Sequence, residues 1–106
     1  MQRLTKDFYG VKELEKDAWE VTFTDETHPV FKAHFEDYPL VPAFLQIDIA
    51  GELLSKELSK IERCKFKLPI LPNDIVVYKI VKQVENNYKI KIFKQDEEVS
   101  ELRVVY

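Results

Sequence analysis

Residues 42–59 read PAFLQIDIAGELLSKELS, and apolar residues recur in this stretch at steps of three and four. This spacing places them along one face of an α-helix and predicts a single helix of about 16–18 residues. Pro42 suits the first turn, because its fixed φ already matches a helix and the first N–H groups lack helical partners anyway. The helix is apolar over much of its circumference, notably at Phe44, Leu45, Ile47, Ile49, Leu53 and Leu54. A sheet must therefore cover more than one narrow face.

On both sides of this helix apolar and polar residues alternate, which is the period of a strand with one buried face. The alternating segments are Phe8–Glu15, Trp19–Phe23, Glu62–Lys67, Ile75–Glu85, Tyr88–Lys94 and Val99–Tyr106. Polar turns at Lys16-Asp17, at Asn86-Asn87 and at residues 95–98 separate neighbouring strands, so the last three are expected to form an antiparallel meander. The pattern predicts an α+β fold in which a curved antiparallel sheet wraps round one long central helix.

Composition sets limits on the kind of protein this is. With 106 residues, 45% of them hydrophobic, the chain is long enough for one domain spanning residues 1–106 and too apolar for a disordered segment. A net charge of −3 without a sustained basic stripe argues against a nucleic-acid partner. Cys64 is the only cysteine, which excludes an internal disulfide and a cysteine-rich zinc site. The first residues are charged and no long apolar run follows, so we expect a cytoplasmic protein with no membrane segment.

Two ionisable residues stand out around the start of the predicted helix. His34 lies in a segment bounded by prolines, and Asp48 falls inside the helix among apolar neighbours. A carboxylate in such surroundings is costly unless it is paired or functional. Taken alone, Asp48 is also compatible with a solvated helix position and His34 with a structural histidine. Their combination directs attention to residues 28–48.

This segment resembles the signature of the 3-hydroxyacyl-acyl-carrier-protein dehydratases, which have the hotdog fold. The family pattern is His-Phe-x-Gly-x-Pro-x-x-Pro-Gly, followed by an acidic residue fourteen positions after the histidine. Here His34-Phe35, Pro39 and Pro42 match it, and Asp48 stands fourteen positions after His34. A second family stretch, Phe-x-x-Pro-x-x-Pro-Gly-Asp, is matched by residues 66–74. The resemblance covers residues 19–106 and implies a hotdog dehydratase domain.

The resemblance implies a hydro-lyase that converts a 3-hydroxyacyl thioester to a trans-2-enoyl thioester in fatty-acid or related acyl biosynthesis. His34 is then the base that takes the Cα proton, oriented by the carbonyl of Leu40, and Asp48 helps the β-hydroxyl leave as water. The amide of Ala43, at the helix N-terminus, is expected to bind the thioester oxygen. Burial should keep Asp48 partly protonated and His34 neutral.

The family also predicts the substrate, the assembly and the absence of a cofactor. The acyl group is expected in a dry tunnel beside Phe35 and Phe44, carried on an acyl carrier protein or coenzyme A, with neither metal nor organic cofactor. In the family each site takes its histidine from one subunit and its acid from the other, so a homodimer is expected. A basic stretch offers a docking surface for an acidic carrier, against the alternative of a merely solvated face; its residues are Lys56, Lys60, Arg63, Lys65 and Lys67.

The sequence departs from the family at its glycines. Asp37, Ala43 and Asn73 stand where the patterns have glycine. A methyl group at Ala43 narrows the approach to the thioester, whereas asparagine at residue 73 tolerates a left-handed backbone. Two other functions therefore stay open. One is a hotdog thioesterase in which Asp48 activates water, and the other is a non-catalytic module that binds an acyl group or its carrier.

Overall fold

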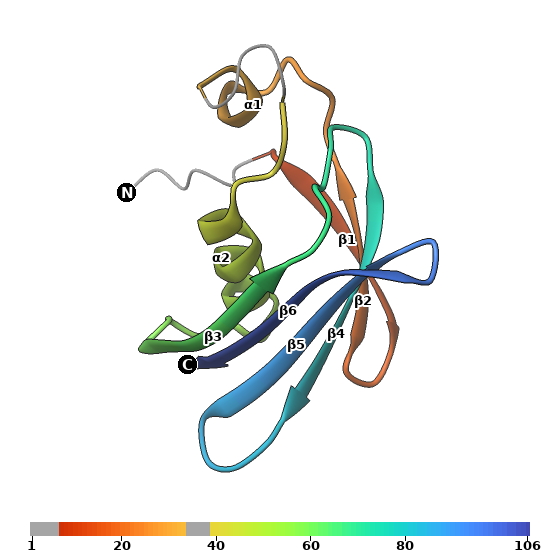
Figure 1. Ribbon diagram of the computed structural model, residues 1–106. Coiled ribbons are helices and arrows are strands. Elements are labelled where there is room, and N and C mark those ends of the chain that lie inside the picture. Colours follow the sequence, from red (N-terminus) through yellow and green to blue (C-terminus); the bar gives the residue numbers. More distant parts are fainter. Residues whose placement is uncertain (1–6, 34–38) are drawn as a thin grey trace.

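The computed structural model describes residues 7–33 and 39–106, and this part folds into one six-stranded sheet with two helices on one side (Figure 1). Every strand pair is antiparallel, and the strand order is β1-β2-β4-β5-β6-β3. The strands are β1 (Tyr9–Glu15), β2 (Ala18–Phe23), β3 (Lys60–Phe66), β4 (Ile75–Lys82), β5 (Asn87–Lys94) and β6 (Glu97–Val105). The predicted meander of the last three strands is confirmed, and β1 and β3 are the two edges of the sheet.

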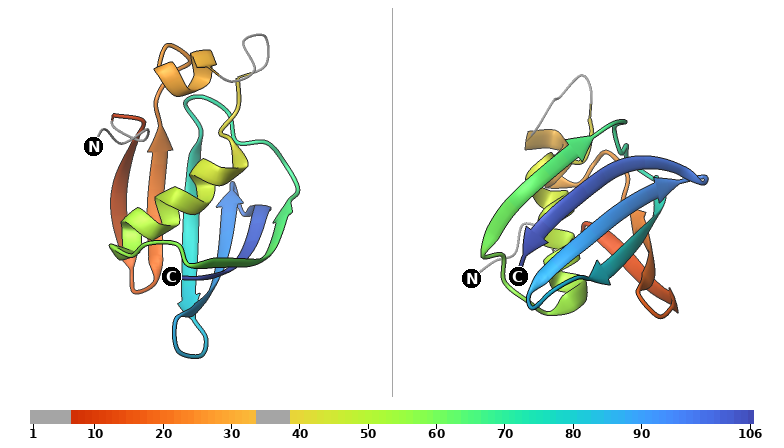
Figure 2. Two further views of the ribbon diagram at one scale, coloured as in Figure 1. Left: turned by 90° about the vertical axis from the view of Figure 1, so that its left-hand side faces the viewer. Right: turned by 60° about the horizontal axis from the view of Figure 1, so that its bottom comes forward.

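Helix α2 (Ala43–Leu54) lies across the inner face of the curved sheet (Figure 2, left). The strand register explains the core, because directly paired residues point to the same side of a sheet. Val21 pairs with Val76, and Ile90 pairs with Leu102; all four side chains are buried on the side that faces α2. The curved antiparallel sheet around a helix is therefore as the sequence pattern predicts.

The prediction of a helix of 16–18 residues is wrong, because α2 ends at Leu54 after 12 residues. Ser55 adopts a left-handed backbone with φ 56°, and its N–H and that of Lys56 bond back to the carbonyls of Glu52 and Gly51. These two hydrogen bonds form a Schellman motif, which satisfies the last carbonyls of the helix and turns the chain away from the helix axis. Leu58 continues the apolar spacing but lies beyond the helix, where its side chain is 40% exposed.

Two local features also differ from the sequence-based expectation. A second, short helix, α1 (Pro29–Ala33), precedes α2, whereas the apolar spacing predicts a single helix. The imidazole Nδ1 of His28 accepts a hydrogen bond from the amide of Val30 at 3.1 Å and so caps this helix. In the hairpin between β4 and β5, the positive φ falls at Glu85 (54°) rather than at Asn86-Asn87. Strand β4 ends at Lys82, three residues before the predicted end at Glu85.

In the part of the chain that the structure describes, no helix has the length and hydropathy needed to span a membrane.

Candidate active site

The N-terminus of α2 presents a backbone donor at the surface. Pro42 precedes the helix with φ −58° and ψ 146°, and its carbonyl accepts the first helical bond, from the amide of Leu45 at 3.1 Å. The amide of Ala43 makes no hydrogen bond to any residue in the described ranges, and Ala43 itself is exposed. A helix N-terminus also carries a partial positive charge. Ala43 thus supplies a donor suited to a developing negative charge.

Asp48 lies on an exposed part of the same helix, rather than in a dry interior as expected from the sequence. Partial burial of the carboxyl, together with the like charge of Glu52 one turn later, raises the pKa of Asp48. The direction agrees with the expectation that this carboxyl holds a proton more readily than a solvated aspartate does. Glu52 in turn accepts a hydrogen bond from the Tyr9 hydroxyl at 2.6 Å.

Glu52 and Tyr9 were not singled out from the sequence. The position of Glu52 four residues after Asp48 was a usable signal, because residues at i and i+4 are neighbours on a helix surface. The contact of Glu52 with Tyr9 depends on how β1 packs beside the helix, and the local sequence carries no sign of it.

Buried polar bonds fix α2 on the sheet. The Ser100 hydroxyl donates to Gln46 Oε1 at 2.7 Å, and Gln46 Nε2 reaches the carbonyl of Val41 at 3.4 Å. The Tyr78 hydroxyl donates to the carbonyl of Gln46 at 3.0 Å. The Tyr106 hydroxyl donates to the carbonyl of Ile47 at 2.8 Å. Since these side chains come from β4, β6 and the C-terminal residue, the sheet sets the height and rotation of the helix that carries Asp48.

The second sequence motif, residues 66–74, forms a loop that is hydrogen-bonded to the segment leading into α2. The amide of Val41, just before α2, donates to the carbonyl of Ile70 at 2.7 Å. Further along the same loop, the amide of Asn73 donates to the carbonyl of Thr24 at 2.9 Å, and Asn73 has the left-handed φ of 67° expected where the family has glycine. The loop therefore connects the end of β2 with the start of α2.

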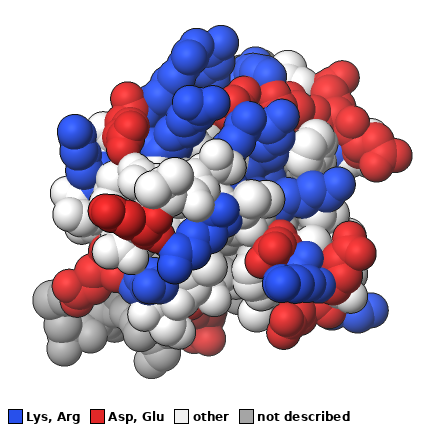
Figure 3. Space-filling view, turned by 90° about the horizontal axis from the view of Figure 1, so that it is seen from below, with Lys and Arg blue, Asp and Glu red and all other residues white. Residues whose placement is uncertain are grey.

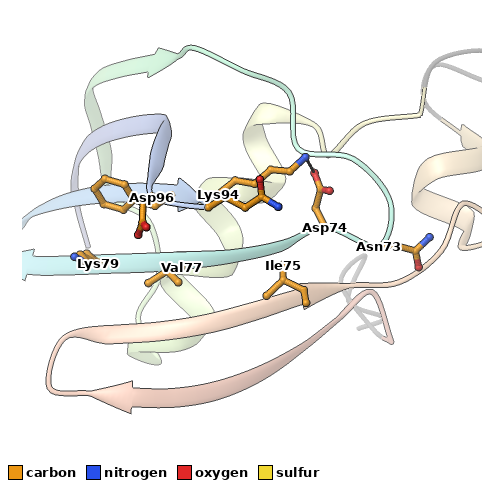
Figure 4. A pocket seen from close by; sticks show the side chains of 9 residues that line it. Asn73, Asp74, Ile75, Val77, Lys79, Lys94 and Asp96 are labelled. Carbon is orange, nitrogen blue, oxygen red and sulfur yellow. Dashed lines mark hydrogen bonds and ion pairs between the residues drawn. The ribbon is translucent and has the colours of Figure 1, made fainter.

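Asp74 closes this loop and borders a groove. One of its carboxylate oxygens accepts from the amide of Leu71 at 2.7 Å and from Lys94 Nζ at 2.8 Å (Figure 4). The groove, about 680 Å³ in volume, lies against β4 and β5 and includes Ile75, Val77 and Phe93. Ile75 and Val77 alternate with the buried core residues of β4, so the groove opens on the outer face, away from α2 and Asp48.

The described residues hold only part of the predicted site. His34 and Phe35, as well as Asp37, lie outside the described residues. Leu40 is half-buried, and its carbonyl bonds to none of the described residues. Phe44 is 47% exposed, so the tunnel expected beside it is not enclosed by the described part of a single chain.

Apolar side chains are also exposed on β3 and on the segments next to it. Ile61 is 49% exposed, Phe66 42% and Leu68 41%. Ile61 and Phe66 pair with the buried residues Val104 and Ser100, so they point to the side of the sheet that carries α2. Isolated exposed apolar residues are common, but a group of them beside an unpaired strand edge is typical of an interaction surface.

The five basic residues proposed for docking do not lie together. Lys56 follows α2, and its Nζ lies 6.0 Å from the centroid of the Tyr88 ring. Lys60, Arg63 and Lys65 lie in β3, and Lys67 comes directly after it. Arg63 and Lys65 pair with Arg103 and Glu101 of β6 and therefore point to the outer face of the sheet. In Figure 3 lysine and arginine side chains gather in the upper left and centre of the view, with acidic residues among them. The structure thus separates Lys56 from the basic outer side of β3.

Comparison with known proteins identifies the family. The family model described as "ApeI-like: ApeI dehydratase" matches residues 11–103, which is most of the chain. The chain belongs to the ApeI-like dehydratase family. Its resemblance to the 3-hydroxyacyl-acyl-carrier-protein dehydratases is thereby confirmed.

Individual relatives of this ApeI-like chain agree with that assignment. The 3-hydroxyacyl-[acyl-carrier-protein] dehydratase FabZ of Thermotoga neapolitana is 36% identical over 64 residues, covering 51% of this chain and 47% of the relative. The chain therefore aligns with about half the length of that protein. Among solved structures, a chain of the dehydratase heterocomplex ApeI:P from Xenorhabdus doucetiae superposes with a TM-score of 0.73 at 21% identity, covering 91% of this chain and 92% of that one.

A second solved structure, an uncharacterized protein from Erwinia carotovora subsp. atroseptica, gives a TM-score of 0.59 at 23% identity, covering 90% of this chain and 87% of that one. At such identities the superpositions establish the fold, which is that of the hotdog dehydratases. In the described ranges of this ApeI-like chain, no group of three or more His, Cys, Asp or Glu side chains is arranged to hold a metal ion.

Proposed function

We propose that this chain is a dehydratase that removes water from a 3-hydroxyacyl thioester, giving a trans-2-enoyl thioester. The observation that carries the proposal is the position of Asp48, a carboxyl with a raised pKa, on the helix whose first amide, that of Ala43, has no partner among the described residues. Asp48 stands five positions after Ala43, which corresponds to about 7.5 Å along a helix axis. One helix thus carries both a candidate proton donor and a candidate anion-binding donor.

The proposed reaction needs a base and an acid on adjacent carbons. His34 takes the proton from Cα, and the electron pair left behind forms the Cα=Cβ double bond as the C–O bond at Cβ breaks. Asp48 gives its proton to the departing hydroxyl, which leaves as water. The Ala43 amide and the partial positive charge of the helix N-terminus stabilise the enolate-like charge on the thioester oxygen. The raised pKa of Asp48 favours the protonated form that this role requires.

The proposed site is completed by a second chain. Asp48 is exposed and Phe44 is 47% exposed in the single chain, although a dehydration site works best when water is excluded. A second chain that covers the open side of α2 would enclose both residues. It can be a copy of this chain, as the resemblance predicts, or a different chain of the same fold, as in the ApeI:P heterocomplex.

The substrate is proposed to arrive on an acyl carrier protein or on coenzyme A, with no cofactor bound to the enzyme. The named activity of the FabZ relative supports the carrier protein. The basic residues along β3, Lys60, Arg63, Lys65 and Lys67, are candidates for attracting an acidic carrier, with Lys56 as a separate contact near the end of α2.

The test is ultraviolet absorbance of the conjugated enoyl product after mixing the protein with 3-hydroxyacyl thioesters, on carrier protein and on free pantetheine. We expect product from the parent chain and none from His34→Ala or from Asp48→Asn. Ser59→Ala, at an exposed position outside the site, is the matched control and should retain activity. Release of free thiol without enoyl product would show a thioesterase instead. Carrier binding that survives Asp48→Asn, with no turnover of any thioester, would show a binding module.

A further inference from the structure

Strands β4, β5, β6 and β3 carry basic side chains on the outer face of the sheet, away from α2. Ile80, Ile90 and Leu102 pair across the strands and are buried, so the residues next to them along each strand point outward. Two outward rows cross these strands. In strand order, one row is Val81, Lys89, Arg103 and Arg63, and the other is Lys79, Lys91, Glu101 and Lys65. The lysines and arginines of these two rows are called the outer basic band.

The outer basic band is costly within a single chain. Arg103 lies directly between Lys89 and Arg63 in the sheet register. In the other row Lys79 lies opposite Lys91. Like charges that face each other directly across two strands destabilise the sheet. A surface of negative charge outside the chain would offset this repulsion.

The chain's own carboxylates compensate only part of the band. Lys89 Nζ lies 3.9 Å from Glu101 Oε1, and Lys91 Nζ lies 3.5 Å from Glu98 Oε1. The other members of the band form no ion pair with any residue that the structure describes, and they are Arg63, Lys65, Lys79 and Arg103. Because the whole chain has a net charge of −3, positive charge is concentrated on this face and negative charge elsewhere. Such an asymmetry orients a protein toward an anionic surface.

Exposed valines stand at one end of the band. Val81 begins the first row and is 47% exposed, and Val84, in the turn between β4 and β5, is 68% exposed. The opposite end of these two strands carries acidic side chains instead, since Asp74 and Asp96 line the groove there. Apolar side chains beside cations suit an anionic bilayer, because the apolar groups enter the headgroup region and the cations meet the lipid phosphates.

The band also faces away from the candidate active site. Helix α2, which carries Asp48, lies behind β3, β6 and β5 in the right-hand view of Figure 2. A carrier protein seated on the band would therefore have the sheet between itself and Asp48. The partner that covers the band is thus expected to differ from the carrier of the substrate.

We propose that the outer basic band binds an anionic lipid bilayer, with the hairpin between β4 and β5 turned toward the lipid acyl chains. The band extends across three strand-to-strand spacings, or about 14 Å, so that several headgroups can meet its cations at once. The bound protein keeps α2 and Asp48 on the side that faces water, where substrate and a second chain have access. This inference does not depend on the proposed dehydratase activity.

The test is co-sedimentation of the full chain with lipid vesicles. We expect binding to phosphatidylcholine vesicles that contain about 30% phosphatidylglycerol and none to pure phosphatidylcholine, at about 100 mM salt. Binding should be lost at about 500 mM salt, because ions screen exposed charges. Lys89→Gln/Arg103→Gln should weaken binding about 25-fold, since each cation near an anionic membrane contributes about fivefold.

Three further variants make the test specific. Arg103→Gln alone should unfold at a higher urea concentration than the parent, because it removes repulsion from both neighbouring strands, and yet bind vesicles about fivefold more weakly. Lys12→Gln/Lys16→Gln makes the same change of net charge as the double variant, at exposed positions on and next to β1, and should bind like the parent. Val84→Ser should weaken binding about threefold, because the hairpin loses its apolar tip.

Equal binding to anionic and neutral vesicles would overturn the proposal, as would equal losses in the band variant and the β1 variant. An unchanged affinity of Val84→Ser would contradict the placement of the hairpin. Binding of an acidic protein, tested with acyl carrier protein, would overturn the proposal if it requires Lys89 and Arg103 while vesicles are not bound. No measurement uses a 3-hydroxyacyl thioester, so failure of membrane binding and failure of the dehydratase activity are observed separately.

Discussion

The Ser100 hydroxyl donates a hydrogen bond to Gln46 Oε1 at 2.7 Å, and both side chains are buried, at 0% and 4% exposure. Gln46 is two residues before Asp48, and its amide nitrogen reaches the carbonyl of Val41, which precedes the helix. A side chain in the core thus joins β6, α2 and the segment that leads into the candidate site. A buried hydroxyl or amide that loses its partner costs far more than the bond itself contributes.

Removing this amide should destabilise the fold. Gln46→Leu leaves the Ser100 hydroxyl without its acceptor, so we expect the free energy of unfolding to fall by about 1–3 kcal/mol. Urea unfolding of the variant, of Ser100→Ala and of the double variant measures the coupling. The double variant should be more stable than the sum of the two single losses predicts, because no unpaired hydroxyl remains. Strict additivity would contradict this interpretation.

Gly51→Ala should destabilise the protein, although alanine is normally the better helix residue. A Cβ at this position would lie 2.9 Å from the carbonyl oxygen of Lys56 and 3.1 Å from Cε1 of Tyr106. The helix end must then open, and we expect a loss of about 1–3 kcal/mol in urea unfolding. Gly10→Ala is the matched control, because a Cβ there meets no atom within 4 Å. An equal response of the two glycines would argue against the close packing at the end of α2.

The pKa of Asp48 should respond to Glu52. Burial and then the charge of Glu52 raise the pKa of Asp48, so Glu52→Gln should lower it. The carboxyl carbon signal of Asp48 in an NMR titration measures this directly. Tyr9→Phe is the control, because it removes the hydrogen bond to Glu52 and keeps the charge. A pKa of Asp48 that stays the same in Glu52→Gln would leave burial as the sole cause.

The same shift predicts how stability depends on pH. A carboxyl whose pKa is higher in the folded state favours folding in its protonated form, so its contribution is complete below the unfolded pKa and is lost as the pH rises through the folded pKa. Asp48→Asn stays neutral throughout. The variant should therefore gain stability relative to the parent as the pH rises from about 3 to about 7, measured by urea unfolding at each pH. A difference that does not change with pH would contradict the raised pKa.

Asn73 should tolerate glycine and reject a β-branched residue. Its φ of 67° is left-handed, a conformation that glycine adopts freely and that costs other residues about 1–2 kcal/mol. Asn73→Gly, which restores the family residue, should leave stability nearly unchanged, and Asn73→Val should lower the free energy of unfolding by about 1–2 kcal/mol. Thermal unfolding distinguishes the two, and equal melting temperatures would be inconsistent with the backbone conformation.

Sequence reasoning succeeded where a local period or a spaced motif carried the information. The alternation in Ile75–Glu85 and Tyr88–Lys94 predicted two neighbouring strands, which the structure places at Ile75–Lys82 and Asn87–Lys94. The spacing from His34 to Asp48 led to the correct family. The end of α2 was missed because Leu58 continues the helical spacing, whereas the left-handed backbone at Ser55 ends the helix. The sequence around Ser55 contains no signal for this helix end, since serine adopts a left-handed backbone much less readily than glycine.

The surroundings of the candidate site were less predictable. Exposure of Asp48 depends on how far the sheet curves around α2, which is a property of the packed chain and not of residues 42–59. The roles of Gln46 and Tyr9 depend on partners more than forty residues away, Ser100 and Glu52. Such pairs leave no local pattern, because the register of the strands brings them together.

The bond from the Val41 amide to the Ile70 carbonyl also limits how this domain can be recombined with its relatives. A chimaera that imports the segment before α2 from another dehydratase, and keeps the native residues 66–74, joins two surfaces that were never selected to fit each other. The exchangeable module therefore consists of two pieces that are separate in the sequence. Transplanting both together should preserve the position of the helix, while transplanting either one alone should misalign it.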